Sequence, residues 1–203
     1  MMPKPKPSKK IIKQDLMWPT PLWHAQIWEF MRSETRVTFN EDFTSWILGV
    51  KEKEQSVRKS NRGGWQSELY EPDNEMFKPL VDEIEEFCKH LPLDIKKVHV
   101  KQLWVNVNKK SDWNIIHQHG QYHLSGTYYV KVPKDSGRIV FRDPRPGAIA
   151  NIFLNNKFDN GEFKRMNLIE GLLAVWPPYL DHFVEPSKTD EERISISFDI
   201  LAK

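Results

Sequence analysis

Two histidines separated by one residue stand in the stretch of this 203-residue chain with the most evident chemical potential. His117 and His119 belong to W-N-I-I-H-Q-H-G-Q-Y-H-L-S-G-T-Y-Y-V, residues 113–130, which runs into an apolar segment of high β-propensity. Because side chains alternate between the faces of a strand, both imidazoles point the same way in an extended backbone and can share one metal ion. His123 has the same parity, but Gly120 predicts a turn that takes it elsewhere. A surface strand with polar histidines also fits the pair, so the metal interpretation needs support from the rest of the chain.

A third ligand must come from a distant segment, and His182, at the start of a short predicted strand, is the best candidate. The following strand, R-I-S-I-S-F-D-I, alternates Arg193 and Ser195 with apolar residues and so has one polar face. A symmetric hairpin between residues 182–185 and 193–196 would place Arg193 opposite His182, where both side chains can contact one bound group. A metal ligand beside a guanidinium suits an anion that also chelates the metal. Taken alone, Arg193 fits equally well as a surface arginine on an edge strand.

The order of these motifs resembles a family of Fe(II)/2-oxoglutarate-dependent oxygenases. The matching elements are H-x-H, L-S-G-x-Y-Y-V, F-x-D-P-R, G-L-L-A-V-W-P-P-Y-L-x-H and R-I-S-I-S-F, and the resemblance covers most of residues 18–200. It implies a double-stranded β-helix, or jelly-roll, in which His117 and His182 bind iron. It also implies that Arg193 with Ser195 binds the distal carboxylate of 2-oxoglutarate. By the same resemblance, Fe(II), 2-oxoglutarate and O2 together oxidise a C–H bond of the substrate, with release of succinate and CO2.

One position departs from the pattern of the wider superfamily, because His119 stands where H-x-D/E usually supplies a carboxylate. The two-histidine, one-carboxylate triad leaves open positions for cosubstrate and oxygen. We expect His119 to be the third ligand, with a water-filled position as the alternative. Asp181 on a strand would face away from His182, and no spacing favours Asp112 or Asp143 as a ligand.

Four further residues are expected to line the cavity that holds the cosubstrate, and two of them, Tyr128 and Asn106, are expected to contact it. The other two are Trp104 and Trp176. Their aromatic members are also typical of an ordinary core.

The hydrophobic pattern predicts a mainly β protein with flanking helices, an α+β arrangement. One helix is expected from an N-cap at Asn40 and a second through Phe77 to Leu91, before the period changes to two at Val98. Further strands are expected at residues 124–132, 138–142, 148–154, 171–176, 181–185 and 193–201. Helices followed by short strands predict a sandwich or barrel with helices over one sheet. The resemblance narrows this to a jelly-roll core covered on one sheet by the N-terminal helices.

Composition is typical of one globular domain, with 39% hydrophobic and 12% aromatic residues. We expect a disordered basic tail at residues 1–13, a helical region at 14–97 and the metal-binding jelly-roll core at 98–203. The tail holds five lysines, and subtracting them from the 30 basic residues leaves 25 against 28 acidic ones. The body is therefore not basic, and its charge gives no strong signal for nucleic-acid binding.

The single cysteine, Cys88, excludes an internal disulfide and a cysteine-rich zinc site. The chain shows no apolar run long enough to span a membrane and no signal-peptide pattern, so we expect a cytoplasmic protein. A homodimer is the commonest default. The substrate is not identified by the sequence: a protein, a nucleic-acid base and a small metabolite all stay open.

Two alternatives to an oxygenase remain at this stage. The H-x-H departure is compatible with a metal-binding jelly-roll that does chemistry without 2-oxoglutarate. A non-catalytic binding module is less favoured, because both halves of a site, His182 and the R-I-S-I-S face, are present.

Overall fold

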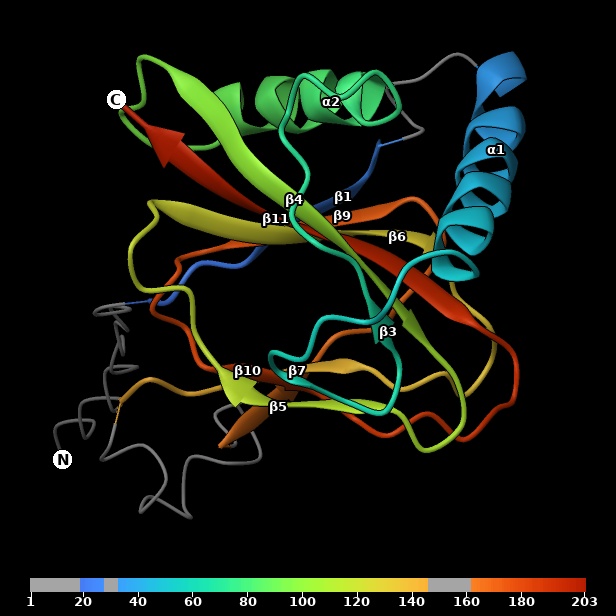
Figure 1. Cartoon of the computed structure of the whole chain (residues 1–203). Helices are drawn as coiled ribbons and strands as arrows, with labels where there is room; N and C mark the ends of the chain where they lie inside the picture. The colour runs from blue at the N-terminus through green and yellow to red at the C-terminus, as the bar shows by residue number, and fades with distance from the viewer. Residues whose placement is uncertain (1–18, 28–32, 146–161) are drawn as a thin grey trace, which may run out of the picture.

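The computed structural model describes residues 19–27, 33–145 and 162–203, and in it two antiparallel sheets face each other (Figure 1). The major sheet has the strand order β1-β9-β6-β11-β4-β3 and the minor sheet the order β2-β5-β10-β7-β8. The described elements are β1 Trp23–Gln26, α1 Ser33–Lys51, β2 Asn61–Arg62, β3 Trp65–Gln66, α2 Lys78–Lys89, β4 Val98–Asn108, β5 Trp113–His117, β6 Leu124–Lys131, β7 Ile139–Arg142, β8 Phe163–Arg165, β9 Leu172–Trp176, β10 His182–Val184 and β11 Arg193–Ala202. The predicted jelly-roll core with helices over one sheet is confirmed. The strand expected at 148–154 lies outside the described residues.

The two helices lie on the outer face of the major sheet (Figure 1). In α2 the apolar positions Leu80, Val81, Ile84 and Cys88 are buried, as the three- and four-residue spacing predicts. The N-cap predicted at Asn40 is wrong, because α1 already begins at Ser33 and Asn40 lies inside it. The side chain of Asn40 does not cap the helix but accepts a hydrogen bond from the Tyr128 hydroxyl in β6.

Strict alternation along β11 separates an apolar face from a polar one. Ile194, Ile196 and Phe198 belong to the core under the helices. Arg193 and Ser195 point the other way and line a cavity between the two sheets. The alternation predicted from R-I-S-I-S-F is therefore confirmed.

The hairpin predicted between residues 182–185 and 193–196 is wrong, because the two strands belong to different sheets. β10 lies between β5 and β7 in the minor sheet, whereas β11 lies between β4 and β6 in the major sheet. Each strand thus has a partner on both edges and leaves no free edge for the other. The residue opposite His182 is His117 on one side and Phe141 on the other. Arg193 reaches the same cavity from across the sandwich.

Within the described residues, no helix combines the length and the hydrophobicity that a membrane span requires. Four described strands lie beyond the predicted set: β1 and β3 form the two edges of the major sheet, and β2 and β8 form those of the minor sheet.

Candidate metal centre

An irregularity in β5 turns two of its residues into the cavity. His117 pairs with His182 and Asn114 pairs with Val184, so three steps along β5 oppose two along β10. Such a bulge changes the alternation of side chains along the strand. Asn114 and His117 therefore both line the cavity, although strict alternation would place them on opposite faces.

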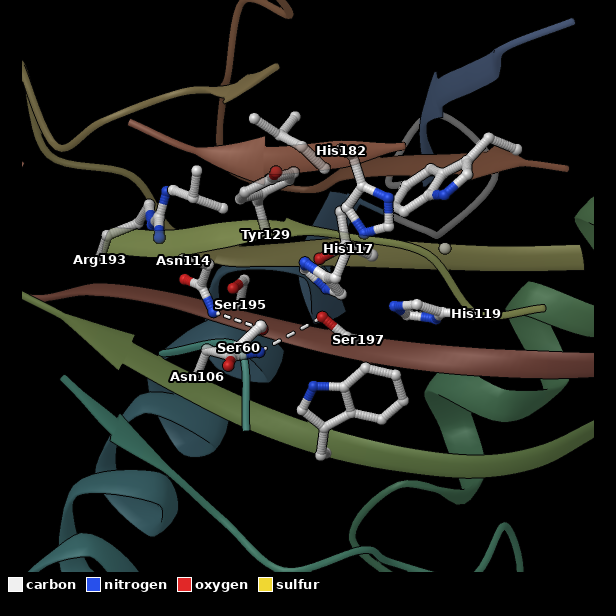
Figure 2. A pocket seen from close by; sticks show the side chains of 16 residues that line it. Ser60, Asn106, Asn114, His117, His119, Tyr129, His182, Arg193, Ser195 and Ser197 are labelled. Carbon is white, nitrogen blue, oxygen red and sulfur yellow. Dashed lines mark hydrogen bonds between the residues drawn. The ribbon is translucent and has the colours of Figure 1, made fainter. Parts of the chain in front are cut away.

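Three imidazoles meet where β5 ends and β10 begins (Figure 2). Each of His117, His119 and His182 offers one nitrogen, and these three nitrogens all lie within 4.8 Å of one another. The rings of His117 and His182 have centroids 4.4 Å apart, and those of His119 and His182 are 5.1 Å apart. The H-x-H pair and the distant histidine are thus brought together, as the sequence predicted.

Hydrogen bonds fix which nitrogen of each ring is free. Nδ1 of His117 lies 2.8 Å from the Ile115 carbonyl oxygen, and Nδ1 of His182 lies 2.9 Å from the Leu180 carbonyl oxygen. A carbonyl only accepts, so each Nδ1 must carry the proton and each Nε2 keeps its lone pair. Nδ1 of His119 lies 2.7 Å from Oδ1 of Asp199, which orients that ring in the same way. Three Nε2 lone pairs are thereby presented together, which is the arrangement a metal ion requires.

Burial keeps two of these imidazoles neutral. Desolvation lowers the pKa of His182 well below its ordinary value, and the nearby His117 lowers it further. Desolvation likewise lowers the pKa of His117. Trp176 packs edge-on against His182 at 5.1 Å and Trp104 lies 5.4 Å from His119, so aromatic rings wall the cluster. Neutral imidazole is the form that binds a metal.

No carboxylate belongs to this three-residue cluster. Of the acids weighed as alternatives, Asp143 is held by Arg145, and Asp112 accepts from the Lys109 amide. Asp181 does not line the cavity, in agreement with the predicted alternation. His123 is turned away: its Nδ1 accepts a hydrogen bond from the Ala202 amide instead.

A buried cation shares the cavity with the histidines. Arg193 is only 2% exposed, and its Nη1 and Nη2 donate to the Gly137 carbonyl oxygen at 3.1 Å and to Oδ1 of Asn108 at 2.9 Å. Its Nε has no partner among the described residues, and none of the described acids forms an ion pair with it. Desolvation lowers the pKa of this guanidinium. A buried guanidinium without a counter-ion is costly, and an anion in the cavity would relieve that cost.

Tyr128 is not in the cavity, contrary to the prediction. Its side chain points to the helical side of the major sheet, where its hydroxyl donates to Oδ1 of Asn40 at 2.8 Å. The neighbouring Tyr129 lines the cavity instead, because the alternation of β6 turns it inward. Burial raises the pKa of Tyr129 to about 12, so it stays a neutral hydroxyl.

The remaining predicted residues do line the cavity: Asn106, Ser195, Trp104 and Trp176. Figure 2 shows Arg193 at one end, the three histidines at the other, and the polar groups between them. Sequence reasoning missed Tyr129, Ser197, Asn114 and Ser60, which also line it. Ser197 lies on the same face of β11 as Ser195, so the alternation that identified Ser195 also predicts Ser197 to line the cavity. Ser60 accepts a hydrogen bond from Nδ2 of Asn114 at 3.1 Å and begins the loop 60–67, which the sequence predicts at the mouth of the barrel.

The fold and the site define a double-stranded β-helix with a histidine cluster and a buried arginine in one cavity. Residues 102–199 match the family described as "Putative 2OG-Fe(II) oxygenase", where 2OG denotes 2-oxoglutarate. The matched segment includes all three histidines, Arg193 and Ser195. This part of the chain is therefore similar to the family of 2-oxoglutarate- and Fe(II)-dependent oxygenases.

Solved structures share the fold at low sequence identity. A Pseudomonas putida prolyl-4-hydroxylase is 12% identical with a TM-score of 0.63, over 91% of this chain and 94% of that one. The α-ketoglutarate-dependent epimerase SnoN is 14% identical with a TM-score of 0.65, over 90% and 78%. HygX from Streptomyces hygroscopicus, solved with nickel, 2-oxoglutarate and hygromycin B, is 12% identical with a TM-score of 0.60, over 89% and 82%. No curated protein shows significant sequence similarity to the chain.

Proposed function

We propose that this protein hydroxylates its substrate as an Fe(II)- and 2-oxoglutarate-dependent dioxygenase, with Fe(II) held by His117, His119 and His182. The match of residues 102–199 to the oxygenase family supports the oxygenase class, and the assignment to residues rests on the geometry. One observation carries the proposal: a single cavity holds both the three-histidine cluster and the buried Arg193. A cosubstrate that chelates a metal at one end and carries a carboxylate at the other needs both.

The histidine cluster fits Fe(II). Imidazole nitrogen is a suitable ligand for iron, and each ring is oriented by a fixed acceptor on its Nδ1. Three protein ligands leave coordination positions open for the cosubstrate and for oxygen.

The opposite end of the cavity fits the distal carboxylate of 2-oxoglutarate. The unpartnered Nε of Arg193 and the spare N–H groups of its terminal nitrogens are donors that match a carboxylate in a fork. We assign Ser195 and Tyr129 as neighbouring hydroxyl groups for the same end, with Tyr129 in the role expected of Tyr128. Asn106 lies between the two ends, and its Nδ2 donates to Oγ of Ser197 at 3.3 Å.

When bound, the iron and 2-oxoglutarate supply the oxidising chemistry, in which 2-oxoglutarate and O2 yield succinate and CO2. The protein's residues bind, orient and exclude water. Trp176 lines the cavity beside His182, and Phe141 packs edge-on against Trp176 at 5.0 Å. The Nε1 of Trp176 is a buried donor without a partner among the described residues, and so offers a hydrogen bond to an oxygen atom in the cavity.

We further propose that the substrate approaches through an outer groove beside His119. This groove shares Trp104 and His119 with the inner cavity and is otherwise lined by amide side chains, Tyr122, Gly120 and Asp199. The solved relatives named above include a prolyl-4-hydroxylase and an enzyme with bound hygromycin B, so their substrates differ widely. The substrate class therefore stays open. A cytoplasmic location and a homodimer stay predictions.

The test is succinate formation from 2-oxoglutarate by the Fe(II)-loaded protein under air. We expect slow succinate release even without the substrate, and its loss in His182→Ala and in Arg193→Met. The control His90→Ala changes an exposed histidine at the end of α2 and should keep the wild-type rate. Equal succinate formation in His182→Ala would contradict the proposal.

The three-histidine ligand set favours one alternative, a jelly-roll metal protein whose chemistry does not use 2-oxoglutarate. Such a protein would bind the metal through the same three histidines, in the wild type and in Arg193→Met alike. It would differ from the proposed oxygenase because even the wild type would form no succinate from 2-oxoglutarate.

A further inference from the structure

A carboxylate is present beside the histidine cluster, one hydrogen bond away from the ligand position. Oδ1 of Asp199 lies 2.7 Å from Nδ1 of His119. The two residues are far apart in sequence, since His119 follows β5 and Asp199 lies in β11 of the opposite sheet. This contact therefore joins the two sheets at the metal centre.

Asp199 is held by a set of donors that leaves it little freedom. Oγ of Ser125 donates to Oδ1 at 2.7 Å, and Nε2 of Gln102 donates to Oδ2 at 2.9 Å. The two donors come from β6 and β4, the strands on either side of β11. The carboxylate is thus fixed from both neighbouring strands, and His119 takes the remaining direction.

The burial of Asp199 is costly and needs a reason. The residue is 2% exposed, and none of the described lysines or arginines forms an ion pair with it; His119 is its partner. Burying a carboxylate costs free energy unless hydrogen bonds compensate it, and here the partners are Ser125, Gln102 and the His119 ring. Of these partners, His119 belongs to the histidine cluster, so the carboxylate is tied to the metal centre.

The consequence for His119 follows from its hydrogen bond. When Nδ1–H donates its hydrogen bond to a carboxylate rather than to a carbonyl, the lone pair of Nε2 becomes a stronger ligand for a metal. The hydrogen bond also fixes the plane of the ring. His117 and His182 have carbonyl acceptors; His119 alone of the three has a carboxylate. The position that departs from the superfamily's two-histidine, one-carboxylate triad is also the one with a carboxylate partner.

We propose that His119 and Asp199 act as one unit that replaces the carboxylate ligand of the usual triad. Asp199 is a positioning residue: it does not touch the metal, but it orients His119 and returns to the site the negative charge that the H-x-H motif removes. This inference rests on the proposed function, since it requires that the three histidines bind a metal.

The experiment measures the affinity of the metal-free protein for Co(II), by its visible absorption, in four proteins: wild type, Asp199→Asn, His119→Asp and the double variant. We expect Asp199→Asn to weaken Co(II) binding about 10- to 100-fold, the range typical for partners of metal-bound histidines. In the His119→Asp background the ligand is itself a carboxylate, so Asp199→Asn should leave the affinity unchanged or raise it. Unequal effects in the two backgrounds are the signature of a coupled pair.

Asp181→Asn is the matched control. It removes the same charge beside His182, but the Asp181 side chain does not line the cavity. A loss as large as that of Asp199→Asn would mean that net charge, rather than the His119 contact, sets the affinity, and would overturn the inference. Equal effects of Asp199→Asn in both backgrounds would do the same.

Thermal melting reports whether each variant folds. If Asp199→Asn does not fold, Ser125→Ala serves in its place, because it removes one donor that holds Asp199 and leaves the carboxylate. It should weaken Co(II) binding several-fold, and an unchanged affinity would overturn the inference. If the wild-type protein binds no Co(II), the proposed function fails and the inference fails with it. If the wild type binds and Asp199→Asn binds equally well, only the inference fails.

Discussion

Substitution of Arg193 by Met is the perturbation with the most specific expected outcome. The guanidinium lies in the cavity with three N–H groups still available: the one on Nε, and one on each terminal nitrogen beyond those that bind Gly137 and Asn108. A carboxylate held by two of them gains two charge-assisted hydrogen bonds of about 1.5–3 kcal/mol each. Since about 1.4 kcal/mol corresponds to a tenfold change, their loss should weaken 2-oxoglutarate binding about 10²- to 10⁴-fold.

The same substitution should leave the metal and the fold in place. None of the three histidines bonds to Arg193, so metal affinity should change little. Methionine fills much of the same volume, and removal of an unpaired buried cation offsets the loss of its two hydrogen bonds to the protein. We therefore expect a melting temperature close to that of the wild type.

Isothermal titration of the Ni(II)-loaded protein with 2-oxoglutarate measures the effect without turnover. Lys188→Met is the matched control, because it removes an exposed positive charge outside the cavity. Unchanged 2-oxoglutarate affinity in Arg193→Met, with the control also unchanged, would refute the assignment of Arg193.

Three further predictions concern pH, backbone strain and the thiol. Burial lowers the pKa of His182, so below pH about 6.5 the unfolded state binds more protons than the folded state. The melting temperature of the metal-free protein should therefore fall as the pH is lowered from 7 to 5, and should fall less in His182→Gln; equal falls would contradict this. Gly137→Ala should destabilise the protein by about 1–3 kcal/mol, because Gly137 has φ +79° and an added Cβ would lie 2.3 Å from the Glu185 carbonyl oxygen. It should also weaken 2-oxoglutarate binding, because the Gly137 carbonyl oxygen accepts a hydrogen bond from Arg193. Denaturant unfolding measures the stability, with Gly49→Ala in α1 as the control. An added Cβ at Gly49 meets no atom within 4 Å, so this change should be neutral or stabilising. A Gly137→Ala protein as stable as the wild type would contradict the backbone strain expected at Gly137. Burial raises the pKa of the Cys88 thiol to about 12, so Ellman's reagent should react with it only in denaturant, and rapid reaction of the native protein would disprove its burial.

Local periodicity was sufficient to predict the elements that carry the site. Alternation along β11 placed Arg193 and Ser195 on one face, and the H-x-H spacing placed His117 and His119 together, because both rules depend only on neighbouring residues. The N-terminal end of α1 was missed because Asn40, a favoured cap residue, bonds to Tyr128 across the core instead.

Long-range pairing could not be predicted in the same way. The segment between His182 and Arg193 has a sequence that is compatible with a hairpin, but it crosses from one sheet to the other. Whether such a segment forms a hairpin or a crossing depends on the strands that pair with β10 and β11, which lie far away in the sequence. The choice of Tyr128 over Tyr129 failed for a related reason. Both tyrosines are buried, and which one faces the cavity depends on which sheet face the helices cover. Asp199 continued the polar alternation of β11, but its partner His119 follows β5 of the other sheet, so no spacing in the sequence joins them.

The measurement that tests the central claim most directly is an anaerobic optical titration of the metal-free protein with Fe(II) and then with 2-oxoglutarate. The account predicts a visible charge-transfer band that forms only when both are present. The band should be absent in His182→Ala, which loses a ligand, and should need far more 2-oxoglutarate in Arg193→Met. A protein that binds Fe(II) tightly but never develops the band would contradict the account, and would favour metal chemistry without 2-oxoglutarate.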